Sequence, residues 1–159
     1  VLTADASGLS DPDGVGAFSY VWKADGTTIS GATGSTYTLT QAEVGKTITV
    51  TASYTDGGGA VESVQSSATS AVANVNDDPT GTVTITGTVS QGETVTANVS
   101  ALADADGLGT LSYQWKADGT DISGATSSTY TLTQDEVGKA VTVAVSYTDG
   151  GSASESVLS

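Results

Sequence analysis

The sequence contains no cysteine, methionine or histidine among its 159 residues. Without cysteine no disulfide can stabilise the fold, and without all three the usual soft metal ligands are absent. The most common general base and the most reactive nucleophile are missing as well. Paired carboxylates can hydrolyse glycosides when a cleft holds them about 5 to 10 Å apart, but the acidic residues here lie on glycine-rich turns. We therefore expect no enzymatic activity.

Basic residues are also scarce. The chain has 4 Lys and Arg against 18 Asp and Glu, which gives a formal net charge of −14. This balance argues against nucleic acid and anionic membranes as partners and favours cations. No stretch of about 18 apolar residues is present, and residues 1–5 show no basic region followed by an apolar core. We expect neither a membrane-spanning segment nor an export signal in this chain.

One sequence is present twice. Sliding the chain on itself by 93 residues places Trp22 on Trp115 and SYVWKADG on SYQWKADG. About two-thirds of the overlapping positions are then identical, and a period of this length fits a small domain rather than a solenoid unit. The stretch Asn-Asp-Asp-Pro at residues 76–79 joins the copies. The repeat predicts two domains, residues 1–76 and residues 77–159.

Apolar and polar side chains alternate along most of the chain, which is the periodicity of half-buried strands. Turn signals such as Asp-Gly and Ser-Gly recur every eight to twelve residues or so, and short strands at that spacing predict an all-β sandwich. Combined from both copies, the expected strands cover residues 82–89, 94–102, 111–116, 121–123, 129–133, 140–148 and, in the first copy, 61–75.

The two copies begin and end at different points of the repeat. Val1 corresponds to Thr94, so the first domain is expected to lack its first strand, and Ser159 corresponds to Ser66, so the last strand of the second domain is cut short. A window from a longer array explains both ends. The alternative is that neighbouring chains supply the missing edges by strand addition, since an open sheet edge favours pairing.

Residues 20–46 and 113–139 share the pattern YxWKADGxxISGATxSTYTLTQxEVGK. Together with the sequence VNDDP at 75–79, this pattern resembles the immunoglobulin-like extender repeats of giant bacterial repeats-in-toxin adhesins. The resemblance implies two tandem immunoglobulin-like β-sandwich domains, secretion to the bacterial cell surface, and calcium at the joints between repeats. Nothing in the chain resembles a ligand-binding tip domain or the glycine-aspartate nonapeptides of a secretion signal.

In an immunoglobulin-type sandwich, the start of the first strand and two of the loops lie at one pole. Clustered carboxylates there would repel one another, and calcium, which takes six to eight oxygen ligands, would remove that repulsion. The candidate ligands in the second copy are Asn76, Asp77, Asp78, Asp104, Asp106 and Asp149. The equivalent set in the first copy is Asp11, Asp13 and Asp56, and Glu43 could reach the joint from the opposite pole of that copy.

Simpler interpretations stand beside these. Asp-Gly and Asp-Asp-Pro are ordinary turn sequences, and Trp22 and Trp115 fit core positions better than a sugar-stacking platform. Tyr54 and Tyr147 are expected to pack or cap a sheet edge. The sequence favours a structural extender of a secreted adhesin with calcium-rigidified joints, with neighbouring repeats as its partners. The alternatives are a filament subunit joined to neighbouring subunits and a module that binds a glycan or protein.

Overall fold

The computed structural model describes all 159 residues, and apart from two single 3-10 turns its regular structure consists of antiparallel strands. The prediction of an all-β protein is confirmed. The chain divides into two compact units, unit 1 at Val1–Asn74 and unit 2 at Val75–Ser159. No helix in it has the length and apolarity needed to cross a bilayer.

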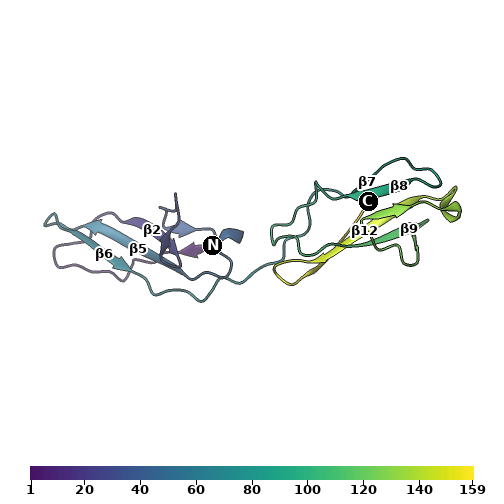
Figure 1. Ribbon diagram of the computed structural model, residues 1–159. Coiled ribbons are helices and arrows are strands. Elements are labelled where there is room, and N and C mark those ends of the chain that lie inside the picture. The colour runs from purple at the N-terminus through teal and green to yellow at the C-terminus, as the bar shows by residue number, and fades with distance from the viewer. The chain divides into compact units, whose positions relative to one another are not determined.

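Unit 2 contains two sheets, which Figure 1 shows as separate layers. One sheet has the order β11-β8-β7 and the other β10-β9-β12-β13. The strands are β7 (Thr84–Thr86), β8 (Thr94–Asn98), β9 (Ser112–Ala117), β10 (Thr120–Asp121), β11 (Thr129–Thr131), β12 (Val141–Thr148) and β13 (Ser154–Leu158). In the register of the larger sheet, Val143 lies opposite Trp115 and Val145 opposite Tyr113.

The core of unit 2 is formed by side chains of both sheets. Val95 comes from the smaller sheet, and Val83 directly precedes β7 of that sheet. Trp115, Val143 and Val145 come from the larger sheet. Because side chains alternate along a strand, every second residue of β12 is directed into this core. The indole nitrogen of Trp115 donates to the backbone carbonyl of Ser127 at 2.9 Å, so its one polar atom is satisfied in the buried site.

Several strands are shorter than the sequence predicted. Residues 82–89 form a strand only at Thr84–Thr86, because Gly81 and Gly87 adopt positive φ angles of 83° and 114° on either side of it. A 3-10 turn, η2 (Gln134–Glu136), follows β11, and Thr133 is its N-cap residue.

Unit 1 repeats this arrangement with one strand fewer. Its sheets have the orders β1-β4 and β3-β2-β5-β6. The strands are β1 (Leu2–Thr3), β2 (Ser19–Ala24), β3 (Thr27–Thr28), β4 (Thr36–Tyr37), β5 (Ile48–Thr55) and β6 (Val61–Gln65), and the 3-10 turn is η1 (Gln41–Glu43). No strand pairs with β1 on the side away from β4, whereas its counterpart β8 pairs with both β11 and β7.

The last strand of unit 1 was predicted to span residues 61–75 but ends at Gln65. Beyond it the chain still follows β5, since Ser66 N–H donates to the carbonyl of Val50 and Thr69 N–H to that of Ile48. The hydroxyls of Ser66 and Thr69 accept the N–H groups of Val50 and Ile48 in return. Side-chain oxygens therefore replace backbone carbonyls here, which interrupts the regular ladder.

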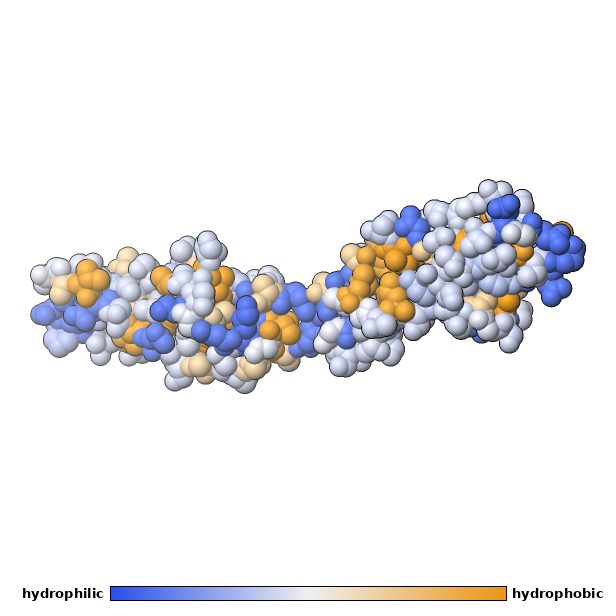
Figure 2. All heavy atoms as spheres, in the orientation of Figure 1, coloured by the Kyte–Doolittle hydropathy of each residue, from blue (hydrophilic) through white to orange (hydrophobic).

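The core of unit 1 is smaller. Its central cluster contains Trp22, Ala24 and Ile48, with half-buried residues such as Leu2 and Val50 packed against it. In Figure 2 the drawn face of each unit is mostly polar or neutral, and smaller apolar patches lie among the polar atoms. Val61 and Val64 on β6 are 77% and 46% exposed, so this strand adds little to the core.

Candidate metal centre

Three carboxylates of unit 2 meet at one end of the β12 strand. Asp104 and Asp106 lie on the loop between β8 and β9, and Asp149 begins the turn after β12. One carboxylate oxygen from each lies within 4.8 Å of the others. The sequence Asp-Ala-Asp-Gly supplies two of these acids on one tight loop, and the β12 to β13 turn brings the third beside them.

Asp104 is held in place by two hydrogen bonds. Its Oδ1 accepts the backbone N–H of Asp106 at 2.8 Å, which closes the loop as an Asx turn. Its Oδ2 accepts the hydroxyl of Tyr147 at 2.6 Å. Burial raises the pKa of Tyr147 well above its ordinary value, and the bond to Asp104 and the neighbouring carboxylates raise it further. The phenol therefore remains a hydrogen-bond donor to Asp104 across the physiological range.

Asp106 connects the loop to the stretch that precedes the first strand of unit 2. Its Oδ2 accepts the backbone N–H of Asp77 at 2.8 Å. Its backbone carbonyl accepts the N–H of Gly150 at 3.1 Å. A Cβ atom at position 150 would lie 2.5 Å from that carbonyl oxygen, so the close approach requires glycine.

Asp149 is the most deeply buried of the three, with 7% of its surface exposed. Its Oδ1 accepts the N–H of Ala153 at 2.8 Å. Its Oδ2 is buried and has no hydrogen-bond partner. A buried carboxylate oxygen without a partner is costly, because the charge has lost its hydration and gained nothing in exchange. A cation in the cluster would supply the missing interaction.

The donor set fits calcium. Two oxygens bound to one calcium ion at 2.3 to 2.6 Å can be at most about 5.2 Å apart, and the three carboxylates lie within that limit at 4.8 Å. All three donors are hard oxygen ligands, and each carboxylate has lone pairs beyond those used by its hydrogen bonds. Asp104, Asp106 and Asp149 would hold the ion, and it would neutralise their mutual repulsion.

The other predicted ligands of unit 2 lie around this cluster rather than in it. The carboxylates of Asp77 and Asp78 are not part of the group of three, and both residues are exposed. Asp77 takes part through its backbone N–H alone. The side-chain amide of Asn76 donates to Glu155 on β13 at 2.9 Å. The stretch of residues 76–79 is thus attached to unit 2 at two points.

Unit 1 contains the same arrangement at Asp11, Asp13 and Asp56, whose carboxylates also lie within 4.8 Å of one another. Asp11 accepts the N–H of Asp13 at 2.9 Å and the hydroxyl of Tyr54 at 3.0 Å. Asp56 is half-buried, and no orphaned buried oxygen occurs at this cluster. No residue of unit 1 corresponds to Asp77, because that position lies before Val1 in the repeat.

Glu43 belongs to unit 1 and caps the η1 turn. Its Oε2 accepts both the N–H and the hydroxyl of Thr40, at 2.9 and 2.8 Å. Burial raises the pKa of Glu43, but the hydrogen bonds from Thr40 and Tyr37 and the charge of Lys46 together outweigh burial and leave that pKa below its ordinary value. The carboxylate therefore has a structural partner within its own turn, and its role as a ligand stays a prediction.

Sequence reasoning missed two residues at the unit 2 cluster, Tyr147 and Glu155. The tyrosines were expected to pack or cap an edge, whereas Tyr147 donates to a candidate ligand. A signal was present, because the pattern Tyr-Thr-Asp-Gly-Gly occurs at both Tyr54 and Tyr147, each 43 residues after the first aspartate of its cluster. Glu155 has a comparable signal, because Glu62 occupies the same place in the first copy of the repeat.

Comparison of the chain with protein-family models, curated proteins and solved structures found no match. The geometry of the cluster is therefore the basis on which function is argued.

Proposed function

We propose that the chain is a structural extender segment of a secreted bacterial surface adhesin, built from immunoglobulin-like domains whose joints calcium makes rigid. The observation that carries this proposal is the orphaned Oδ2 of buried Asp149 beside Asp104 and Asp106. A cation would supply the interaction that the orphaned oxygen lacks, and a set of ligands made only of oxygen atoms favours a hard cation such as calcium.

The contact between Asp77 and Asp106 links this metal site to the joint. Asp77 lies only three positions after Asn74, the last residue of unit 1, and its N–H is bound by a carboxylate of the cluster. A cation that fixes Asp106 would therefore also fix the first residues of unit 2. Without the cation, repulsion among the carboxylates would loosen the loop and release the connecting stretch.

A structural role is also consistent with the distribution of the acids. Both clusters lie on tight loops, and each loop is closed by a hydrogen bond within its own unit. The sequence contains no histidine or cysteine that could act as a catalytic base or nucleophile beside them. The immunoglobulin-like nature of each unit is supported by two sheets that share one core and by a buried tryptophan on β9 and on β2.

Small-angle scattering of the whole chain in calcium and in chelator tests the proposal. We expect calcium to narrow the distribution of distances between the units, and the Asp104→Ala/Asp106→Ala double variant to scatter alike in both conditions. A wild-type scattering profile unchanged by chelator would contradict a calcium-rigidified joint. Extracellular calcium sites have dissociation constants of about 0.1 to 1 mM, so the titration should extend to about 10 mM.

A further inference from the structure

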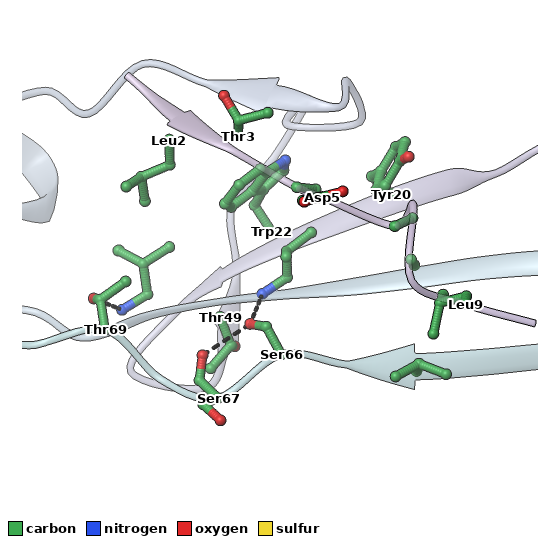
Figure 3. Close-up of a pocket in the computed structure, with 16 residues that line it drawn as sticks. Leu2, Thr3, Asp5, Leu9, Tyr20, Trp22, Thr49, Ser66, Ser67 and Thr69 are labelled. Atoms are coloured by element: carbon green, nitrogen blue, oxygen red, sulfur yellow. Dashed lines mark hydrogen bonds between the residues drawn. The ribbon is translucent and has the colours of Figure 1, made fainter.

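The segment that follows β6 is bound to unit 1 at regular intervals. Figure 3 shows two of the contacts, in which the hydroxyls of Ser66 and Thr69 accept backbone N–H groups of β5. A third contact is made by Val72, whose N–H donates to the carbonyl of Lys46 at 2.9 Å and whose carbonyl accepts the N–H of Gly45 at 2.8 Å. Unit 1 therefore holds this segment in place as far as Val72.

A side-chain hydrogen bond extends this attachment to the last residue of unit 1. Nε2 of Gln41, on η1, donates to Oδ1 of Asn74 at 3.2 Å. We call this bond the unit 1 anchor. Both side chains are neutral amides and neither belongs to a carboxylate cluster, so the anchor does not require a cation.

Unit 2 binds the chain again from Asn76 onward. The side-chain amide of Asn76 donates to Oε1 of Glu155 at 2.9 Å, which we call the unit 2 anchor. The N–H of Asp77 follows with its bond to Asp106. Glu155 lies outside the group of three clustered acids, and an ionised acceptor makes its bond stronger than one between neutral groups. The unit 2 anchor therefore needs no cation either.

Val75 is the one residue between the two anchors. Its surface is 79% exposed, and its backbone makes no hydrogen bond. Because peptide bonds are planar, a residue contributes only the two torsions φ and ψ to the motion of a chain. Branching at Cβ favours extended backbone for valine and restricts those torsions further.

We infer that Val75 is the hinge of this chain, and that the bonds of Gln41 to Asn74 and of Asn76 to Glu155 keep the unanchored link one residue long. Motion of one unit with respect to the other then occurs through the torsions at Val75. This source of stiffness goes beyond the proposed function, because neither anchor uses a clustered carboxylate and neither depends on calcium.

Distances between two spin labels, measured by double electron–electron resonance, test the inference. The chain contains no cysteine, so Thr27→Cys and Thr120→Cys place one label on each unit at exposed, equivalent positions of the repeat. In saturating calcium we expect Asn74→Ala to widen the distance distribution about 1.7-fold, because the unanchored link grows from one residue to three and its reach rises with the square root of that number. A widening should also occur in chelator.

Variants of the hinge itself should act in opposite directions. Val75→Gly should widen the distribution, since glycine adopts backbone conformations that valine does not. Val75→Pro should narrow it, because proline fixes φ and the N–H that it removes has no hydrogen-bond partner.

The unit 2 anchor is tested in the same labelled chain. Glu155→Ala should widen the distribution about 1.4-fold, because the unanchored link grows from one residue to two. Glu155→Gln should restore the wild-type width, since its side-chain carbonyl can still accept the amide of Asn76. The matched controls are Asn98→Ala and Glu62→Ala, which remove the same side chains away from the connecting stretch and should leave the width unchanged.

Two results would overturn the inference. One is a wild-type width in Asn74→Ala or in both variants of Val75. The other is an equal widening by Asn98→Ala, which would trace the effect to a general loss of stability. The proposed function is judged separately, by whether calcium narrows the wild-type distribution, so failure of one is distinguishable from failure of the other.

Discussion

The hydroxyl of Tyr147 donates a 2.6 Å hydrogen bond to Oδ2 of Asp104, a residue 43 positions earlier in the chain. Tyr54 and Asp11 make the equivalent contact in unit 1 at 3.0 Å. The contact ties the end of a central strand to the loop that carries two of the three clustered carboxylates. It is thus part of the support that fixes the candidate metal centre before any ion binds.

Removal of this hydroxyl tests its contribution to stability. Tyr147→Phe leaves the carboxylate of Asp104 with one partner fewer, and hydrogen bonds to charged groups contribute about 1.5 to 3 kcal/mol. We expect a loss of that size in the free energy of unfolding of unit 2, measured by urea denaturation in chelator. Tyr54→Phe is the matched control and should cost less, because its bond is longer. Equal losses from both variants would contradict this ranking.

The capping turn of unit 2 gives a pH-dependent prediction. Hydrogen bonds from the backbone and hydroxyl of Thr133 lower the pKa of Glu136 below its ordinary value. The unfolded chain therefore binds the proton more readily, so the contribution of Glu136 to stability is present above the ordinary pKa and is lost as the pH falls through the lowered one. At pH 7, Glu136→Gln should lower the free energy of unfolding by about 1 kcal/mol.

That difference between wild type and Glu136→Gln should begin to close as the pH falls through the ordinary pKa of a glutamate, and should close fully below the lowered pKa, where the wild-type carboxyl is also neutral. Urea denaturation across pH 3 to 7 measures it. Glu43→Gln is the matched variant in unit 1, since Glu43 makes the same two bonds to Thr40. A difference that stays constant with pH would show that the pKa of each carboxyl is the same in the folded and the unfolded chain, which would contradict the lowered values.

The orphaned oxygen of Asp149 predicts that the effect of Asp149→Asn on stability changes sign between chelator and calcium. Asp149→Asn can keep the bond from Ala153 and removes a buried charge without a partner, so in chelator we expect the variant to be as stable as wild type or more stable. In calcium the wild type should gain about 2.7 kcal/mol at a hundredfold excess over the dissociation constant, and the variant should gain far less.

Thermal unfolding of both proteins in chelator and in 10 mM calcium measures this. Asp56→Asn serves as the control at the half-buried position of the unit 1 cluster. A wild type that is more stable than Asp149→Asn by the same amount in both conditions would assign Asp149 a purely structural role.

The alternation of apolar side chains and the recurring turns were sufficient to predict an all-β protein. The convergence of Asp104, Asp106 and Asp149 was also predicted, because the expected sandwich topology places Asp-x-Asp-Gly and Asp-Gly-Gly on loops at the same end. Strand lengths were not predictable to the same degree. The hydroxyls of Ser66 and Thr69 occupy the hydrogen bonds that would continue the last strand of unit 1, and an alternating pattern does not report such competition.

The burial of Asp149 could not be predicted from the sequence, because Asp56 occupies the same place in the repeat and is only half-buried. The two positions share the Tyr-Thr-Asp-Gly-Gly motif. In unit 2 the stretch of residues 76–79 binds to Asp106 and Glu155. Tertiary contacts of this kind leave no signal in the local sequence of the motif.

The most direct test of a calcium-binding joint is isothermal titration calorimetry of calcium into the wild-type chain and into the Asp104→Ala/Asp106→Ala variant. We expect wild-type binding with a dissociation constant of about 0.1 to 1 mM, and loss in the variant of the binding that belongs to unit 2. Absence of binding heat in the wild type, together with a melting temperature unchanged by calcium, would leave these carboxylates as turn-forming and solubilising residues and would contradict the proposed function.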